Sequence, residues 1–456
     1  MLFPKFTARR CINSNEWITQ MGMNVLVVGG GGREHALVWK ITQSPLVGTV
    51  YCAPGNAGIA QLATCVEISV DDLRAMKQFA IEKKIELVVI GPEVPLVMGM
   101  ADEMQEAGMK VFGPNKAAAA IEGSKTLMKE LCQRYKVPTA EYRTFTDAEA
   151  AKAYVAGEGA PIVVKTSGLA AGKGAIVCLT VPQAIEAIDR IMVKREFGHA
   201  GDEVVIEEFL EGEEASFLAL VDGKTILPLA GSQDHKAVGE GDTGPNTGGM
   251  GAYSPAALLD DDEMVRRVMD QVMIPIVQGM AADGMPYKGV LYAGLMIHNG
   301  RIKTLEFNAR FGDPECQPLL MRMKSDIMPL LLACADGTLH EHEIEWDSRT
   351  AMCVVMAAGG YPNMYEKGLP ITGLEEAAEL TDCMVFHAGT RRHNGHVLTD
   401  GGRILGVTGL GEGAIGARIN AYEAVRKIHW KDAYYRRDIG YRAVEREEAA
   451  LDEDEG

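Results

Sequence analysis

The chain has 456 residues, of which 47% are hydrophobic and 24% charged, as in ordinary globular proteins. This length corresponds to about three domains and excludes a single small binding module. The formal net charge of −18 argues against a general nucleic-acid or membrane-surface binder, because affinity for phosphate comes mainly from Lys and Arg. An anionic substrate would need a locally basic pocket. The 51 glycines imply many tight turns.

The nine cysteines include no C-x-x-C pair, so they indicate neither a disulfide framework nor a zinc site. We expect a reducing compartment and a cytoplasmic protein. No stretch reaches about 18 apolar residues, so no membrane span is expected. Residues 1–22 lack a secretory apolar run, and Met23 stands directly before a good strand. They are expected to be a disordered extension, either a misassigned start or a tag-like segment, in preference to an organelle transit peptide.

Residues 23–123 alternate apolar strands with helical stretches, a pattern typical of a doubly wound domain with a parallel sheet. Ligands bind such sheets at the carboxyl ends of the strands. Glycine-rich turns occur at these ends, at 29–32, 55–58 and 91–93. The expected strands are 24–28, 49–53, 86–90 and 110–112, and the expected helices are 34–44, 71–84 and 96–107.

Residues 142–212 predict a small α+β unit, which separates 124–141 from 213–348. Its expected elements are strands at 161–165, 175–179 and 203–207 and a helix at 182–194. The segment 213–348 predicts an antiparallel sheet with strands at 216–221, 289–298 and 303–311. The glycine-rich stretch 239–251 is expected to be a long functional loop.

Residues 349–447 predict a last α+β unit, and residues 448–456 an acidic tail that frays. Its expected strands are 351–357, 384–387 and 403–407. The fold class is therefore a multidomain α/β and α+β protein.

The glycine run Gly29–Gly32 follows a strand but does not fit a dinucleotide fingerprint. Glu34 stands where the third glycine is needed, and no acid follows the second strand. Backbone amides at the helix start still suit a small phosphate, and Arg33 adds charge. The alternative is that these glycines only allow a tight turn.

The segment Lys165–Gly174 resembles a phosphate-binding P-loop, but its spacing is wrong and Gly174 replaces the metal-binding hydroxyl. A P-loop is excluded. What remains is a glycine hairpin between two strands, with Lys165 on a strand and Lys173 in the turn, able to fold over a polyphosphate. A flexible hairpin with solvated lysines is the alternative.

The segment Leu305–Phe311 is the most informative. On a strand, alternation places Glu306, Asn308 and Arg310 on one face. Carboxylate and amide oxygens suit Mg²⁺ or Mn²⁺ bridging nucleotide phosphates, and an arginine suits charge that develops on a transferring phosphoryl group. The alternative is the polar face of an edge strand.

A strand end at 205–210 followed by Glu214 fits adenine held by main-chain groups and a ribose held by a carboxylate. This signal is weak alone, since Glu clusters are usually solvated. Its weight comes from the combination of two lysines, a ribose acid, a Glu-x-Asn-x-Arg strand and no P-loop.

These residues match one family closely: the chain resembles the phosphoribosylamine–glycine ligase (glycinamide ribonucleotide synthetase) family of the ATP-grasp superfamily. The matches run in order from Met23 to about Glu447, and the loop 242–255 distinguishes this family from other ATP-grasp members. Thr166–Ser167 departs from the usual Ala-Asp. The matching segments are 31–36, 53–58, 91–93, 123–125, 168–174, 207–210, 232–236, 242–255, 306–315 and 437–440.

The resemblance implies that ATP, glycine and 5-phosphoribosylamine give glycinamide ribonucleotide, ADP and phosphate in purine biosynthesis, through glycyl phosphate. It implies an ATP-grasp body at 124–141 and 213–348 with a small mobile lid at 142–212. It also implies Mg²⁺ or Mn²⁺, small-molecule partners only, and a monomer or weak homodimer. The alternatives are a related ATP-grasp carboxylase and a non-catalytic ATP-binding regulator.

The resemblance also assigns roles to particular residues. The expected catalytic residues are Arg310 and Asp234, and the expected metal ligands are Glu306 and Asn308. The expected ATP-binding residues are Lys125, Lys165, Gly172, Lys173, Glu207, Phe209, Leu210 and Glu214. The expected substrate-binding residues are Gly31, Gly32, Arg33, Asn56 and Gly58 at the phosphoribosyl end, and Asn246, Thr247, Gly248 and Gly249 near glycine and the amine.

Overall fold

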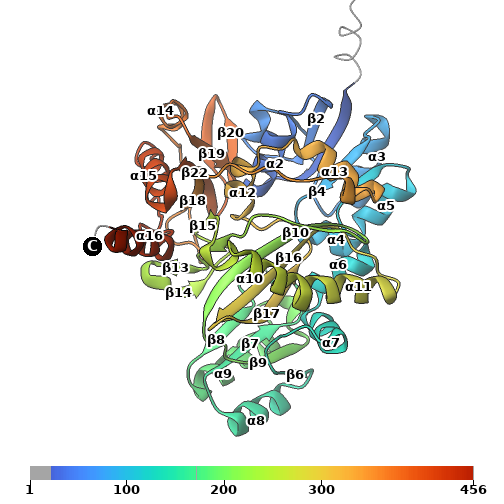
Figure 1. Cartoon of the computed structure of the whole chain (residues 1–456), viewed down its shortest axis with the longest axis vertical. Coiled ribbons are helices and arrows are strands. Elements are labelled where there is room, and N and C mark those ends of the chain that lie inside the picture. The colour runs from blue at the N-terminus through green and yellow to red at the C-terminus, as the bar shows by residue number, and fades with distance from the viewer. Residues whose placement is uncertain (1–21, 171, 455–456) are drawn as a thin grey trace, which may run out of the picture.

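The computed structural model describes residues 22–170 and 172–454. Figure 1 shows an N-terminal sheet in blue at the top, a central sheet, a small sheet at the bottom and a C-terminal sheet in orange and red. Apart from Gly22, the predicted extension lies outside the described residues. No helix in these two ranges is long and apolar enough to cross a membrane.

The N-terminal sheet is parallel, with the strand order β3-β2-β1-β4-β5, which confirms the predicted doubly wound domain. Its central strand contains a continuous apolar run from Val25 to Val28 that is fully buried, as expected for a strand covered on both faces. The predicted helix at 96–107 is wrong in one respect: Gly99, with a left-handed φ of 100°, divides it into two helices. The elements are β1 (Met23–Gly29), α2 (Gly32–Ile41), β2 (Val47–Pro54), β3 (Thr64–Cys65), α3 (Leu73–Glu82), β4 (Leu87–Ile90), α4 (Glu93–Met98), α5 (Met100–Glu106) and β5 (Lys110–Phe112).

The central sheet is antiparallel, with the order β11-β10-β16-β17. Two helices lead into it from the N-terminal sheet, and others cover it. The strand predicted at 303–311 ends at Asn308, so Arg310 lies beyond it. The elements are α6 (Lys116–Gly123), α7 (Lys125–Tyr135), β10 (Glu213–Asp222), β11 (Ile226–Pro228), α10 (Asp262–Val268), α11 (Ile274–Ala282), β16 (Lys288–His298), β17 (Arg301–Asn308), α12 (Cys316–Arg322) and α13 (Ile327–Asp336).

The small sheet at the bottom of Figure 1 has the order β6-β9-β7-β8 and is antiparallel. Its strands pack with two helices in a hydrophobic cluster of their own, which includes Val155, Ile162, Ile188 and Ile206. The α-helix predicted at 182–194 ends at Ile188 and continues as a π turn. The elements are β6 (Tyr142–Phe145), α8 (Ala148–Glu158), β7 (Ile162–Thr166), β8 (Ala175–Cys178), α9 (Val181–Ile188), the π turn Asp189–Val193 and β9 (Val204–Glu208).

The C-terminal sheet has the order β12-β15-β18-β22-β19, and two of its strands come from the middle of the chain. The loop predicted at 239–251 contains a strand of the short hairpin β13–β14, and the acidic segment 448–454 continues a helix instead of fraying. The elements are β12 (Gln233–Asp234), β13 (Ala237–Gly239), β14 (Thr243–Asn246), β15 (Gly251–Ser254), β18 (Thr350–Ala357), α14 (Leu374–Ala378), β19 (Cys383–His387), β20 (Thr390–His393), β21 (His396–Thr399), β22 (Arg403–Gly411), α15 (Gly413–Val425) and α16 (Tyr441–Asp454).

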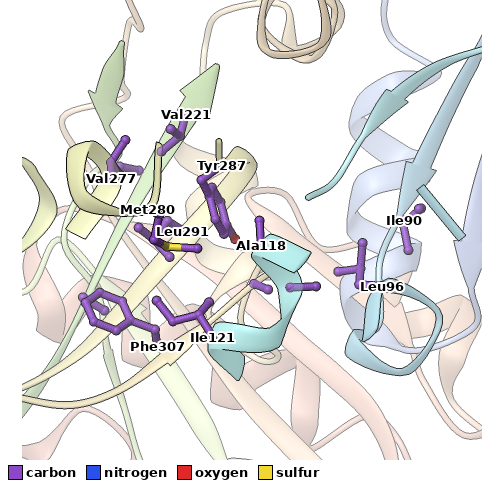
Figure 2. Packing of buried hydrophobic residues seen from close by; sticks show 14 of the residues in the cluster. Ile90, Leu96, Ala118, Ile121, Val221, Val277, Met280, Tyr287, Leu291 and Phe307 are labelled. Atoms are coloured by element: carbon purple, nitrogen blue, oxygen red, sulfur yellow. The ribbon is translucent and has the colours of Figure 1, made fainter. Parts of the chain in front are cut away.

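The N-terminal and central sheets share one hydrophobic core. Figure 2 shows α6 between them: Ala118 and Ile121 lie between Phe307 of the central sheet and Leu96 of the N-terminal domain. Phe307 is 2% exposed. This packing anchors β17, the strand that carries the predicted metal ligands.

Candidate active site

One cavity, of about 410 Å³, brings together residues of all four sheets or the loops beside them. The predicted site residues that line it are Arg33, Lys125, Lys165, Gly172, Glu207, Phe209, Leu210, Glu214, Asp234, Asn246, Thr247, Gly248, Glu306, Asn308 and Arg310. Of the predicted residues, all of which the structure describes, those outside the lining are Gly31, Gly32, Asn56, Gly58, Lys173 and Gly249.

Glu306 and Asn308 line the cavity from β17, while Phe307 between them is buried. The pairing of β16 with β17 shifts at Leu305, which is an extra residue in β17, and such a bulge re-aims the side chains beside it. Burial alone would raise the pKa of Glu306, but neighbouring cations, led by Lys236, lower it to about 2. Glu306 is therefore ionised, as a metal ligand must be.

Arg310 lies in the bend after β17, so its expected place on the strand face is wrong, yet its side chain still lines the cavity. Its Nη2 lies 2.8 Å from Glu122 Oε1, and its Nε lies 3.4 Å from Glu93 Oε2. Glu122 Oε2 also accepts a hydrogen bond of 2.6 Å from the backbone N–H of Ala309. Burial opposes the charge of Arg310, but the two carboxylates raise its pKa, so Arg310 is a permanent cation held in one place.

The two lysines predicted to hold phosphate reach the cavity from different elements. Lys165, on β7, lies 2.8 Å from Glu207 Oε2 on the neighbouring strand β9 and donates a hydrogen bond of 3.2 Å to the Leu305 carbonyl. Lys125 begins α7, and burial lowers its pKa. The cavity lining thus contains lysines that could meet phosphate, although acidic side chains also line it.

The predicted nucleotide-binding carboxylates are already paired in this structure. Glu207 lies 3.1 Å from Lys129, a fully buried lysine on α7 that the sequence pattern did not single out. Glu214 lies 2.7 Å from Lys236. Phe209 follows β9 and lies between Glu207 and Glu214 in the sequence. It also lines the cavity.

Asp234 lies on β12 and lines the cavity together with the loop at 246–248. Burial raises the pKa of Asp234 to about 8; Lys236 only partly offsets burial, and Glu315 adds negative charge. A carboxyl group in this environment gains most from a cationic partner such as an ammonium group.

The start of α2, predicted to hold a phosphate, faces the side chain of Asp313. A Cβ added to Gly31 would lie 3.2 Å from Asp313 Oδ2. Although burial opposes ionisation, Arg403 and Arg33 lower the pKa of Asp313. Arg33 alone of the predicted residues in this region lines the cavity.

Asn56 and Gly58 lie in the turn after β2, and their surroundings explain their residue types. The Asn56 side chain accepts hydrogen bonds from the backbone N–H groups of Gly58 and Ile59 and donates to the carbonyls of Gly30 and His387. A Cβ at Gly58 would lie 2.4 Å from the ring of His35. Their role in binding substrate stays a prediction.

The glycine hairpin of the small sheet contacts the C-terminal unit. Lys173 donates a hydrogen bond of 3.1 Å to the Pro362 carbonyl and lies 6.0 Å from the ring centre of Tyr361. A Cβ at Gly172 would lie 2.8 Å from the Thr247 carbonyl. In this conformation Lys173 faces the C-terminal unit, and Gly172 permits the close approach.

Arg403, on β22, is a site residue that sequence reasoning missed. Its Nη1 donates hydrogen bonds of 2.6 Å to the carbonyls of Gly248 and Asp313. The C-terminal unit therefore braces two loops of the cavity. A basic side chain directly after the paired glycines 401–402 was the available signal, but it identifies no partner. Other lining residues that were missed are Glu93, Glu122, Lys236, Tyr292, Asp313 and Glu315.

The donor set at β17 fits a hard divalent cation that shares its ligands with a phosphate. Glu306 and Asn308 offer one carboxylate and one amide oxygen. Among the described residues, no group of three His, Cys, Asp or Glu side chains could hold a metal ion by itself. Mg²⁺ is usually bound by one or two carboxylates together with substrate phosphates and water, which this arrangement allows.

A small antiparallel sheet beside a larger one, with two lysines and a Glu-x-Asn-x-Arg sequence around the same cavity, defines the ATP-grasp class of enzymes. Enzymes of this class use ATP together with divalent metal ions. Models of the phosphoribosylglycinamide synthetase family match the chain in three parts: the N domain over residues 23–122, the ATP-grasp (A) domain over 123–316 and the C domain over 351–442. The chain therefore belongs to the phosphoribosylglycinamide synthetase, or phosphoribosylamine–glycine ligase, family.

Individual relatives agree with this assignment. The phosphoribosylamine–glycine ligase of Vibrio vulnificus (strain CMCP6) is 54% identical over 429 residues, which is 93% of this chain and 100% of that protein. The protein of the same name from Escherichia coli O157:H7 is 53% identical over 430 residues, with the same coverage. The predicted resemblance and fold class are thus confirmed.

Solved structures show the same fold. The phosphoribosylamine–glycine ligase of Thermotoga maritima has a TM-score of 0.80 at 31% identity and covers 92% of this chain and 100% of its own. The biotin carboxylase domain of the Hydrogenobacter thermophilus 2-oxoglutarate carboxylase has a TM-score of 0.70 at 16% identity, over 91% of this chain and 92% of its own, which is a likeness of fold alone.

Proposed function

We propose that this protein joins glycine to 5-phosphoribosylamine with ATP, giving glycinamide ribonucleotide, ADP and phosphate. The observation that carries the proposal is the convergence of Glu306, Asn308 and Arg310 with Lys125 and Lys165 on one cavity of a chain that belongs to this family. The reaction is a step of purine biosynthesis.

The chemistry needs an activated carboxyl group, because a carboxylate oxygen is a poor leaving group. An oxygen of the glycine carboxylate attacks the γ-phosphorus of ATP, the bond to the ADP oxygen breaks, and glycyl phosphate forms. The amine of phosphoribosylamine then attacks the glycyl carbonyl, a proton leaves the nitrogen, and phosphate departs with the former carboxylate oxygen. The protein contributes mainly positioning and charge neutralisation, as in other phosphoryl transfers.

Particular residues have particular tasks in this proposal. Lys125 and Lys165 neutralise the ATP phosphates, and Glu306 with Asn308 would hold Mg²⁺ or Mn²⁺, which supplies Lewis-acid charge at the transferring phosphoryl group. Arg310 stabilises the charge that develops at the phosphoryl and tetrahedral states. Glu207 and the main chain at 209–210 bind adenine, and Glu214 binds the ribose after release from Lys236.

Charge assigns residues to the ammonium group of glycine and to the phosphate end of phosphoribosylamine. Asp234 accepts the ammonium group of glycine, a cation that compensates its buried carboxylate. Arg33 binds the phosphoribosyl end beside the glycine turns at 31–32 and 56–58, with the loop at 246–249 near the amine. We propose the segment 142–212 as a lid that excludes water from the acyl phosphate.

We further propose a cytoplasmic enzyme that acts on small molecules as a monomer or weak homodimer. The eight described cysteines are all free, which agrees with a reducing compartment. Light scattering at several protein concentrations measures the oligomeric state, and a dimer that survives dilution to nanomolar concentrations would contradict this assignment.

The decisive experiment is a coupled assay of ADP release with freshly made phosphoribosylamine and Mg²⁺, in which one arm lacks glycine and another contains bicarbonate. We expect ADP release that requires both glycine and the amine and is indifferent to bicarbonate. Release that needs bicarbonate instead of glycine would assign a carboxylase, and no release in any arm, with ATP still bound, would assign a non-catalytic ATP-binding protein.

A further inference from the structure

Lys129 is a fully buried lysine whose ammonium group lies beside Glu207, the carboxylate proposed to bind adenine. It lies on α7, one turn after Lys125, and it does not line the cavity. Its Nζ lies 3.1 Å from Glu207 Oε1 and donates hydrogen bonds to the Thr139 hydroxyl at 2.7 Å and the Ala140 carbonyl at 3.4 Å. These contacts hold the ammonium group in one position.

Glu207 is 2% exposed, and its Oε1 has no hydrogen-bond partner among the described residues, although the charge of Lys129 lies beside it. A buried carboxylate oxygen without a partner is costly, and Oε2, which lies 2.8 Å from the cavity-lining Lys165, needs a new donor once that lysine turns to phosphate. The exocyclic amino group of adenine is a donor of the required kind. A purine with a carbonyl oxygen at the same position would place an acceptor against this acceptor.

Two lysines, Lys129 and Lys165, form ion pairs with Glu207. We expect only one of these pairs to persist when nucleotide binds. Lys165 lines the cavity and is proposed to neutralise phosphate, so its ion pair with Glu207 weakens in the complex. Lys129 cannot reach the cavity. It is then the remaining cation beside the buried carboxylate of Glu207.

We propose that Lys129 is a positioning residue that sets the preference for a 6-amino over a 6-oxo purine nucleotide, by holding Glu207 as an oriented carboxylate that accepts a hydrogen bond from the base. The inference rests on the proposed function, in which Glu207 binds adenine. Without Lys129, Glu207 loses the charge that orients its carboxylate, and its hydrogen bond to the 6-amino group weakens.

The test compares ATP with inosine triphosphate, which carries an oxygen in place of the 6-amino group. Steady-state kinetics of the full chain and of Lys129→Met are measured with both nucleotides. We expect the preference for ATP in kcat/KM to fall about 10- to 100-fold, the range for one hydrogen bond to a charged group. The fall is expected in KM, with kcat at saturating ATP changed less than about threefold.

Lys40→Met is the matched control, because Lys40 is also a buried lysine but bonds the Met323 carbonyl away from the cavity. It should leave the nucleotide preference unchanged. If Lys129→Met does not fold, Thr139→Val removes the hydroxyl that accepts from Lys129 and should lower the preference in the same direction by a smaller factor.

Thermal shifts with each nucleotide, in the absence of glycine and amine, report binding without turnover. An unchanged preference for ATP in folded Lys129→Met, by kinetics and by thermal shift, would overturn the inference. Failure of the proposed function is distinguishable, because it appears in the unsubstituted protein as ADP release that does not depend on glycine.

Discussion

Arg310 owes its position to carboxylates that come from other elements. Glu122, at the end of α6, bonds both the Arg310 guanidinium and the neighbouring Ala309 N–H, so one side chain fixes the arginine and the backbone that carries it. Burial raises the pKa of Glu122, and Arg310 is the main charge that offsets this effect. The pair is therefore mutually dependent.

Glu122→Gln tests this dependence. The amide keeps the shape but loses the charge that orients Arg310, so we expect kcat to fall about 10- to 100-fold while KM for ATP changes little, because the loss falls on the transition state. The coupled ADP assay measures both constants. Glu130→Gln, at an exposed position of α7, is the control and should leave both unchanged. A rise in KM for ATP at constant kcat would instead place Glu122 in nucleotide binding.

At the scale of single residues, the sequence predicted those site residues whose chemistry is carried by a local pattern. Glu306, Asn308 and Lys165 belong to such patterns and line the cavity, whereas Lys173 of the glycine hairpin does not. Lys129 and Arg403 have no pattern of their own. Their significance depends on partners 78 and 155 positions away, Glu207 and Gly248, which only the folded chain brings near.

The glycine hairpin between β7 and β8 shows how an element limits what a site can do. Gly172 has a left-handed φ of 76°, and it lies so close to the Thr247 carbonyl that a methyl group on its Cα would have no room. The hairpin can therefore approach the loop at 246–249 only with glycine at this position.

Gly172→Ala is expected to displace the hairpin from the cavity. The new Cβ would lie 2.8 Å from the Thr247 carbonyl oxygen, so we expect KM for ATP to rise at least about tenfold, with a stability loss of about 1 kcal/mol from the left-handed backbone. Kinetics and urea unfolding measure these effects.

Gly157→Ala is the matched control, since it lies inside α8 with open space around its Cα. It should leave KM unchanged and stabilise the protein by about 0.5–1 kcal/mol, because alanine suits a helix better than glycine. Equal effects of the two substitutions on KM would contradict the role given to Gly172.

At the scale of elements, most strands and helices were predictable because apolar residues repeat with the period of each. The failures have physical causes. Gly99 stops a helix by its backbone conformation, and the strand predicted to run to Phe311 stops at Asn308, where Glu122 takes the N–H of Ala309. The hairpin β13–β14, which overlaps the predicted loop, has little apolar periodicity, so the sequence pattern did not predict it.

The N-terminal and C-terminal units meet at a pair of buried histidines. His35 Nδ1 accepts a hydrogen bond of 2.7 Å from the backbone N–H of His387, so His35 must be neutral at that atom. Burial, followed by the nearby His387, lowers the pKa of His35 from 6.5 to about 3. Burial and Arg392 lower the pKa of His387 to about 4.

This interface predicts acid sensitivity of the whole molecule. Below about pH 6.5 the unfolded chain binds protons that the folded chain refuses until pH 3–4, so stability is full above pH 6.5 and falls as the pH is lowered through this window. At about 1.4 kcal/mol per pKa unit, each histidine should cost roughly 2 kcal/mol of unfolding free energy between pH 7.5 and 5.0.

Urea unfolding at the two pH values measures the loss. His35→Asn offers an oxygen near the position of Nδ1 and removes one titrating group, so it should reduce the pH dependence by about half. His199→Asn, where the histidine side chain is 94% exposed, should not alter it. A pH dependence that persists in full without His35 would exclude the histidine pair as its source.

At the scale of the molecule, the switch between parallel and antiparallel patterns predicted a multidomain α/β and α+β fold, which the structure confirms. The sequence did not predict that two strands of the C-terminal sheet, β12 and β15, come from the middle of the chain. Strands β12 and β15 are only two and four residues long, too short to show a period, and β18, the partner of β15, lies almost 100 positions further along.

The pairing of β15 with β18 also sets an order of events during synthesis. The N-terminal sheet is complete once residue 112 has left the ribosome, and the small sheet once residue 208 has, so both can form early from local contacts. Gly248 and Asp313, by contrast, remain without the brace of Arg403 until β22 has been made. A ribosome that stalls before this strand would release a chain with most of its domains folded and its catalytic cavity unfinished.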